Sequence, residues 1–361
     1  MAKNQNIGSL IVTSIWRWSI SDISRVGFFI RILRVFTFST IRRTCMKIVI
    51  RAKIPGVLAI SPTMSCNYDC VGCYSRDRVS ENELSTDEID KLYKEAENLG
   101  ISTIVVTGGE PFVRDDTIEL AEKHKRLLFV IITNGSFISK ELAERISKSR
   151  NVITLVSIEG FTADTDLRRK EGAYEAVLSA FDSLRKSDAF YGFAATNTTA
   201  NSENLCSDKF IEDMTSRGCA VGFLSEYVPC GLNPRMDWVL HEDLRVKIRN
   251  KVLKIRREKS IIIIQFPQDE YGSDNTCSAA GKSSIHISSQ GSIEPCPFVP
   301  ISTESIRNVG LIGACKSEFM KAIRKRPGLL KRQKFACALF EHMKEIKKLS
   351  ENIEKISIRK K

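Results

Sequence analysis

Long apolar runs are missing from this sequence, and histidine is scarce. No run of 18 uncharged apolar residues occurs, so the sequence predicts no membrane-spanning helix. The start shows no apolar segment leading to a small-residue cleavage site, and no secretory signal is therefore expected. The four histidines fall in no metal-ligand register, and no Ser–His–Asp pattern, phosphate-cradling loop or zinc-protease motif occurs. These absences argue against a spanning helix, a secreted chain and the enzymes built on those motifs.

Cysteine, by contrast, is abundant. The chain has 361 residues and eleven cysteines, an odd number, and three of them stand within residues 66–73. A secreted disulfide framework fits this distribution poorly, so we expect a reducing cytoplasm in which thiolates are free to bind metal. Apolar residues make up 42% of the chain and charged residues 27%, which predicts a globular protein with a sizeable core.

The net charge of +12 is concentrated at the two ends of the chain. Residues 1–53 carry ten Lys and Arg against one acidic residue, and residues 316–361 carry fifteen against five. No RNA- or DNA-binding motif accompanies the charge, so nucleic acid is not an expected partner. The Lys-rich helix predicted at 343–358 is interpreted as a solvated face.

The basic start is also apolar. Aromatic residues alternate with arginines at roughly helical spacing, which is typical of a helix lying in a membrane interface. We therefore predict an amphipathic helical extension over 1–53 that contacts an anionic membrane surface, peripheral on the inner face of the membrane. The alternative is a helical extension packed on the body, with Arg side chains at its edge. The residues of this pattern are Trp16, Arg17, Trp18, Arg25, Phe28, Phe29, Arg31, Arg34, Phe36, Phe38, Arg42 and Arg43.

From residue 54 onward, short β-branched runs alternate with helical stretches. The predicted strands are 57–61, 102–107, 128–133, 152–158, 191–197, 220–225 and 261–266. The predicted helices are 86–99, 116–125, 139–148, 173–186, 208–216 and 241–257. This alternation predicts an α/β fold with a parallel sheet and right-handed crossovers, short of a closed eight-unit barrel. Beyond about residue 269, loops rich in Gly, Ser and Cys predict a small appended domain. The expected division is 1–53, 54–265 and 266–361.

Three cysteines follow the first predicted strand, at Cys66, Cys70 and Cys73. Cysteines spaced in this way within one loop can wrap a [4Fe–4S] cluster and leave one of its four irons without a protein ligand. Zinc is the competing interpretation, but a structural zinc site needs a fourth ligand. The third interpretation is that the three cysteines are buried as small hydrophobic residues.

This loop, including Tyr74 after the third cysteine, resembles the cluster motif of the radical S-adenosylmethionine (SAM) enzymes. The resemblance covers about residues 55–235 and implies a partial (β/α)6 barrel. It also implies that SAM chelates the open iron and that an electron from a reductant such as ferredoxin or flavodoxin cleaves it. The 5′-deoxyadenosyl radical so formed abstracts a hydrogen atom from the substrate.

Further matches to this family stand at the ends of later strands. Gly108–Pro111 resembles the family's Gly-Gly-Glu-Pro motif, and Thr133-Asn134-Gly135 resembles a recurrent triplet. Glu159 stands where the family commonly has Asp, which leaves open whether Arg168 or Arg169 fills the family's arginine role. The resemblance implies SAM contacts at Gly108, Gly109, Glu110, Pro111, Asn134, Ser157, Arg168 and Asn197.

The C-terminal cysteines form a second pattern. A predicted hairpin between Cys277 and Cys296 resembles the auxiliary-cluster domain called SPASM, or its shortened twitch form. The resemblance implies a second [4Fe–4S] cluster held by Cys277, Cys296 and Cys337, with Cys315 as the fourth ligand. The alternative is a degenerate domain that keeps these cysteines for packing.

The sequence therefore predicts a radical SAM enzyme. Two substrate classes are expected first, a peptide and a membrane-associated lipid or isoprenoid, and small-molecule cofactor synthesis is the third alternative. No catalytic residue on the substrate side is identified. The alternative is a cluster-binding or electron-transfer protein without turnover.

Overall fold

The computed structural model describes residues 7–20, 22 and 25–358. The predicted extension also includes residues 1–6, 21, 23 and 24, and the predicted C-terminal segment includes 359–361; these lie outside the described residues.

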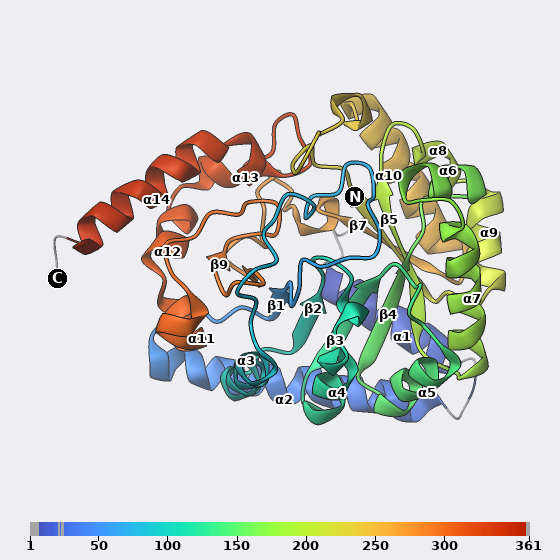
Figure 1. Ribbon diagram of the computed structural model, residues 1–361, viewed down its shortest axis with the longest axis horizontal. Coiled ribbons are helices and arrows are strands. Elements are labelled where there is room, and N and C mark those ends of the chain that lie inside the picture. Colours follow the sequence, from blue (N-terminus) through green and yellow to red (C-terminus); the bar gives the residue numbers. More distant parts are fainter. Residues whose placement is uncertain (1–6, 21, 23–24, 359–361) are drawn as a thin grey trace.

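One sheet organises the molecule (Figure 1), and its order is β7-β6-β5-β4-β3-β2-β1-β8-β9. Every neighbouring pair from β7 to β8 is parallel, and β9 is antiparallel to β8. The α/β fold and the seven strands predicted up to residue 266 are confirmed. The strands are β1 Val57–Ile60, β2 Thr103–Val106, β3 Leu128–Thr133, β4 Val152–Ser157, β5 Tyr191–Asn197, β6 Val221–Glu226, β7 Ile262–Phe266, β8 Ser284–Ile287 and β9 Ile293–Glu294.

Helices alternate with the strands through β7, as parallel pairing requires. Helix α3 shows how local sequence sets a boundary: Ser85 and Glu88 form a capping box, and Gly100 ends the helix with φ of 77°. The first helices are α1 Ile7–Ile20, α2 Val26–Ile50, α3 Thr86–Leu99, α4 Asp116–Lys123, α5 Lys140–Ser149, α6 Thr162–Arg168 and α7 Ala173–Lys186. The others are α8 Ser202–Leu205, α9 Asp208–Ser216, α10 Glu242–Glu258, α11 Ile306–Lys316, α12 Glu318–Arg324, α13 Ala338–Glu341 and α14 Met343–Ile358. Short 3-10 turns lie at Pro111–Val113, Met236–Trp238, Gln268–Glu270 and Pro327–Leu330.

The sheet extends beyond the six strands that the resemblance implies. Strand β7 adds to the edge formed by β6, and β8 adds to the edge formed by β1, where Leu58 pairs with Ile285. Strands β8 and β9 belong to the segment 266–361, so part of the predicted appended domain is built into the main sheet. The division into three domains stays a prediction.

The sheet buries both of its faces. On β3, Phe129 and Ile131 belong to the core between the sheet and its outer helices. Leu128 and Val130 face the inside of the curved sheet and belong to a second core. This alternation explains the nearly continuous apolar strands, because each face of a buried parallel strand packs against something.

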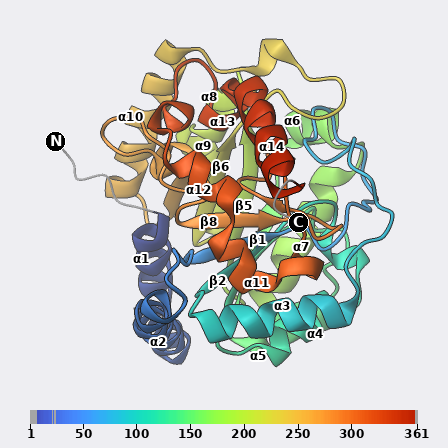
Figure 2. The ribbon, with the colours of Figure 1, turned by 90° about the vertical axis from the view of Figure 1, so that its left-hand side faces the viewer.

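Helices α1 and α2 complete the second core. Leu10 and Ile15 of α1, with Phe28 and Ile32 of α2, are buried against the inner face of the strands. Their partners include residues at the amino ends of strands: Leu128, Ile153, Val221 and Ile262. Figure 2 shows both helices on the opposite side of the molecule from the loop after β1. The N-terminal helices thus close the amino end of the partial barrel.

The predicted extension is therefore packed on the body along one face, as the alternative interpretation of the sequence had it. Trp18 and Phe28 hold this contact, because both rings pack on Phe190, with ring centroids 5.2 Å and 5.7 Å away. Within the described part of the chain, no helix is both long and apolar enough to cross a bilayer.

We expect Phe190→Ala to loosen the N-terminal helices, because the ring of Phe190 is 2% exposed and contacts both of them. Removing a buried Phe ring costs about 3–5 kcal/mol of unfolding free energy. Urea unfolding, with limited proteolysis of the segment 7–50, measures the effect. Phe38→Ala is the control, since Phe38 is 69% exposed on α2. Equal unfolding midpoints for the two variants would contradict the packing described.

Candidate functional site

The three-cysteine loop leaves the carboxyl end of β1. Cys66 is exposed and Cys70 and Cys73 are half-buried, and none of the three is in a disulfide. The Tyr68 N–H donates to the Cys66 sulfur at 3.4 Å, and the Ser75 hydroxyl lies 3.2 Å from the Cys73 sulfur. The loop thus presents three free thiols at the edge where the parallel strands end.

The turn after β2 is fixed to this loop by backbone hydrogen bonds. The Gly109 N–H donates to the Thr63 carbonyl and the Glu110 N–H to the Ser65 carbonyl, each at 2.9 Å. A Cβ atom on Gly109 would lie 2.2 Å from the Ser65 carbonyl oxygen, so no side chain fits there. The glycine in this motif is therefore needed for contact between the two loops.

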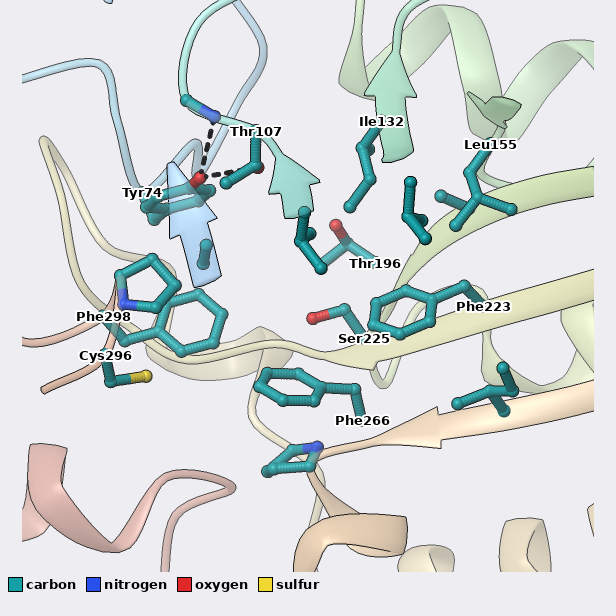
Figure 3. A pocket seen from close by; sticks show the side chains of 18 of the residues that line it. Tyr74, Thr107, Ile132, Leu155, Thr196, Phe223, Ser225, Phe266, Cys296 and Phe298 are labelled. Atoms are coloured by element: carbon teal, nitrogen blue, oxygen red, sulfur yellow. Dashed lines mark hydrogen bonds between the residues drawn. The ribbon is translucent and has the colours of Figure 1, made fainter. Parts of the chain in front are cut away.

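Tyr74 reinforces the same junction (Figure 3). Its hydroxyl lies 2.9 Å from the Thr107 hydroxyl and accepts a hydrogen bond from the Gly108 N–H at 3.2 Å. On its other side, the Tyr74 ring packs edge-on against Phe298, with centroids 5.4 Å apart. The aromatic residue after the third cysteine thus joins the loop both to β2 and to the C-terminal segment.

Glu110 ties the turn to β3. Its carboxylate is 1% exposed and accepts hydrogen bonds from the Thr133 hydroxyl at 2.7 Å, the Asn134 N–H at 2.7 Å and the Phe112 N–H at 3.0 Å. Burial raises the pKa of Glu110, although these hydrogen bonds oppose the increase. Asn134 in turn donates to the side-chain oxygen of Asn67 in the cysteine loop at 2.8 Å. Glu110 and Asn134 thus hold three strand ends together.

A buried charge cluster follows β4. The carboxylate of Glu159 is fully buried and pairs with both Arg168 and Arg169, the latter at 2.6 Å. Burial alone raises the pKa of Glu159, but the two guanidinium groups outweigh burial and lower it. Both candidate arginines therefore contact the same carboxylate.

The two arginines also lie beside the cysteine loop. The Arg168 carbonyl accepts the Val71 N–H at 2.8 Å. Burial raises the pKa of Cys70, and the charges of Arg169 and Arg168 act against that rise. The Nε of Arg168 is buried without a hydrogen-bond partner. Positive charge beside three thiols, with an unused donor, suits an anionic cluster and a carboxylate-bearing ligand such as SAM.

These groups surround one cavity of about 800 Å³ that reaches into the barrel. Ser157 and Arg169 line it, and so does Thr196, which Figure 3 shows pointing inward. Asn197 does not line this cavity; it lines a small separate one together with Glu226 and Arg245. The predicted site residues that do line the main cavity are Cys66, Cys70, Cys73, Gly108, Gly109, Glu110, Asn134, Ser157, Arg168, Cys277, Cys296 and Cys337.

A second group of cysteines meets at the same cavity. Cys296 and Cys337 are hydrogen-bonded to each other. Burial raises the pKa of Cys277 to about 11, and Cys337 adds to the increase. Burial likewise raises the pKa of Cys230 to about 12, and Cys337 is again a neighbour that raises it. Cys315 is buried on α11 beside Arg324 and has none of these neighbours among its interactions.

Of Cys230 and Cys315, Cys230 is the one that has Cys337 as a neighbour, so a proposed fourth ligand falls on Cys230. In residues 7–20, 22 and 25–358, no three His, Cys, Asp or Glu side chains are close enough to hold a single metal ion. A four-iron cluster is larger than one ion and spaces its thiolates farther apart. Four convergent free thiols suit such a cluster.

Comparisons with known proteins identify the family of this chain. Residues 60–196 match the model of the radical SAM superfamily. The AdoMet-dependent heme synthase of Methanosarcina barkeri is 26% identical over 280 residues, 70% of this chain and 80% of that protein. A probable GTP 3′,8-cyclase of Saccharolobus islandicus is 31% identical over 215 residues, 56% of this chain and 67% of that protein.

Solved structures share the fold. Streptococcus suis SuiB bound to precursor peptide SuiA has a TM-score of 0.63 at 15% identity, covering 78% of this chain and 69% of that one. A structure of anSMEcpe with bound AdoMet has a TM-score of 0.61 at 15% identity, covering 82% of this chain and 96% of that one. The chain belongs to the radical SAM superfamily and is an enzyme. Membership implies a [4Fe–4S] cluster and SAM as cofactors; the SPASM- or twitch-like character of the C-terminal segment stays a prediction.

The sequence leaves one residue of this region open and misses two others. Arg169 is expected only as an alternative to Arg168, although both pair with Glu159. Thr196 is absent from the predicted site, which has its neighbour Asn197 instead; the alternation of side chains along β5 is the signal that could have identified Thr196. Cys230 stands alone in the sequence, and no local pattern connects it with Cys337.

We expect Glu159→Gln to destabilise the protein, because it leaves two buried guanidinium groups without their carboxylate. Breaking a buried ion pair costs about 3–5 kcal/mol. Folding lowers the pKa of Glu159. The loss of unfolding free energy relative to wild type should therefore be complete above about pH 5 and should shrink as the pH falls further. Urea unfolding from pH 7 to pH 3 measures it.

Asp237→Asn is the matched control, because Asp237 pairs with Arg235 at the surface. Its unfolding midpoint should equal that of the wild type. A Glu159→Gln variant as stable as this control would show that the buried charge cluster is not structurally important.

Proposed function

We propose that this enzyme cleaves SAM reductively at a [4Fe–4S] cluster bound by Cys66, Cys70 and Cys73. The cluster and SAM together supply one-electron chemistry that ends in hydrogen abstraction from a substrate held in the barrel cavity. The observation that carries the proposal is the meeting of three free thiols, the Gly108–Pro111 turn and the Arg168–Arg169 pair around that cavity.

The protein's own residues have separable roles in this proposal. Gly108 and Gly109 let the turn after β2 approach the cysteine loop, and Glu110 and Asn134 keep the strand ends in place. Ser157 and the unpaired Nε of Arg168 are available to a ligand in the cavity. The predicted SAM contacts of Pro111 and Asn197 find less support, because neither lines the main cavity.

We further propose that Cys230, Cys277, Cys296 and Cys337 hold a second [4Fe–4S] cluster. Their convergence from four separate segments supports this, as does the absence of any disulfide among them. Cys277, Cys296 and Cys337 line the cavity that also contains the first three cysteines, so both clusters would serve the same substrate space.

The expected partners are a reductant such as ferredoxin or flavodoxin and a substrate, for which two classes stand ahead of a small-molecule cofactor precursor. SuiB, which shares this fold, is seen with a precursor peptide, and this observation supports a peptide substrate. The basic, apolar N-terminal helices support a lipid or isoprenoid and a peripheral position on an anionic inner membrane face.

Iron content tests the two cysteine sets. We expect anaerobically reconstituted protein to contain about eight irons, because each [4Fe–4S] cluster contributes four. Changing Cys66, Cys70 and Cys73 together to Ala should remove about four, and so should the corresponding change of Cys230, Cys277, Cys296 and Cys337. Iron and acid-labile sulfide assays with Mössbauer spectra report the result.

Cys315→Ala separates the fourth ligand proposed here from the one expected from the sequence. This variant should keep all its iron, whereas Cys230→Ala should lower the iron of the second site. The reverse result would restore Cys315 as the ligand, and no iron loss from the fourfold variant would remove the second cluster.

SAM cleavage tests the reaction. With dithionite and SAM, wild-type protein should release 5′-deoxyadenosine, and the Cys66, Cys70 and Cys73 variant should release none. Cys206→Ala is the control, because Cys206 is buried at the end of α8, belongs to neither cysteine set and does not line the main cavity. Cleavage that survives in the triple variant would place the reaction elsewhere.

A further inference from the structure

The cavity has two chemically different halves. Near the cysteine loop it is lined by thiols, Glu110 and the two arginines. Deeper in the barrel the lining is apolar, as Figure 3 shows for Ile132, Leu155, Phe223 and Phe266. The rings of Phe223 and Phe266 stack with centroids 5.8 Å apart. Apolar walls of this kind bind hydrocarbon and aromatic groups, and the size suits a small-molecule ligand.

The apolar half ends at the N-terminal helices. Ile7, Ile11 and Ser14 of α1 line the cavity, together with Phe36 and Arg43 of α2. The cavity therefore runs through the barrel, from the cysteine loop at the carboxyl ends of the strands to the helices that close the amino ends. These helices therefore close the substrate space at the amino ends of the strands.

The side of the N-terminal helices that faces away from the cavity is apolar and exposed. Helix α2 is apolar on two faces, because Phe28, Ile32 and Val35 pack inward while other large side chains point to solvent. We call the solvent-facing set on α2 the outer face, and it consists of Ile30, Leu33, Phe38, Ile41, Ile48 and Val49. Ile41 is 58% exposed and Ile48 76%. A patch of this kind marks an interaction site.

Basic residues surround the outer face. Arg34, Arg42 and Lys47 are exposed on α2, and neither α1 nor α2 contains an acidic residue. The body adds positive charge beside them at Arg150. Burial lowers the pKa of Arg31 on α2, and the charge of Arg150 lowers it further, so the two guanidinium groups lie near each other. Cations held close together without acidic partners favour an anionic surface opposite them.

A second copy of this chain fits this face poorly, because two such faces would oppose like charges. An acidic protein would account for the basic residues but not for the large exposed apolar side chains among them. An anionic bilayer accounts for the charged and the apolar residues, since it offers headgroup charge to the arginines and hydrocarbon to the outer face.

Building on the function proposed above, we infer that the outer face docks on an anionic membrane and that the apolar half of the cavity binds the hydrocarbon chain of a membrane lipid or isoprenoid. The chain lies between the N-terminal helices and the cysteine loop, so its end or a unit along it reaches the site of hydrogen abstraction. A peptide substrate is the competing outcome.

Vesicle co-sedimentation tests the docking surface. Full-length protein should bind phosphatidylcholine vesicles containing a quarter phosphatidylglycerol, and should bind pure phosphatidylcholine at least tenfold more weakly. The variant Ile41→Glu with Ile48→Glu should lose at least tenfold of its binding to the anionic vesicles. Val246→Glu is the matched control, because Val246 is exposed on α10, and it should bind like wild type. Equal binding by the double variant and this control would overturn the docking surface.

A fluorescent chain tests the cavity. The probe 11-(dansylamino)undecanoic acid should bind wild-type protein with increased emission, and farnesol should displace it. Ala194→Phe fills the apolar half and should weaken probe binding at least tenfold; Ala59→Phe does the same from β1 if the first variant fails to fold. Ser179→Phe, on the exposed side of α7, is the control. Undiminished probe binding in the folded, filled variants would overturn the chain-binding cavity.

The wild-type protein also separates this inference from the proposed function. Iron content and SAM cleavage are measured without lipid, and their absence would reject the radical chemistry whatever the vesicles show. If both are present but farnesol fails to displace the probe while an unstructured peptide does, the substrate class is peptide and the inference is wrong.

Discussion

The contact between the turn after β2 and the cysteine loop is the constraint on which the site depends. Two backbone hydrogen bonds hold the loop against Gly109 and Glu110, and the missing side chain of Gly109 makes that approach sterically possible. A loop that carries three thiols in a long connection would otherwise sample many arrangements. Fixed in this way, it faces the ends of the parallel strands, where Glu110 and then Glu159 extend the same network to β3, β4 and β5.

The apolar amino end of the partial barrel is the second constraint. A curved sheet with an apolar inner face cannot remain exposed to water, and α1 and α2 cover its amino end. The space that they do not fill is the cavity. The two helices shield it at the amino ends of the strands, and the thiols border it at the carboxyl ends. A reaction that passes through a radical needs such shielding from water and from competing groups. The N-terminal helices are therefore part of the substrate space, although they bring none of the proposed cluster ligands.

The sequence predicted best what depends on local pattern. The seven strands up to residue 266 and helices such as α3 follow from apolar periodicity and from caps such as Ser85 with Gly100, and these signals are local. The pairing of β8 with β1 depends on contacts more than 200 residues apart, which no local pattern encodes. The grouping of Cys230 with Cys337 has the same origin. The double role of α2, apolar on both faces, could be anticipated only as two competing interpretations, because periodicity cannot say which face is covered.

The most direct test is the electron paramagnetic resonance spectrum of the dithionite-reduced protein before and after SAM is added. The spectrum is best recorded in the variant that lacks Cys230, Cys277, Cys296 and Cys337, so that one cluster remains. We expect an S = ½ signal of a reduced [4Fe–4S] cluster whose g values change when SAM binds, because one iron has no protein ligand. A reduced cluster whose signal is indifferent to SAM would contradict the open iron. Absence of any cluster signal in this variant would contradict the assignment of Cys66, Cys70 and Cys73.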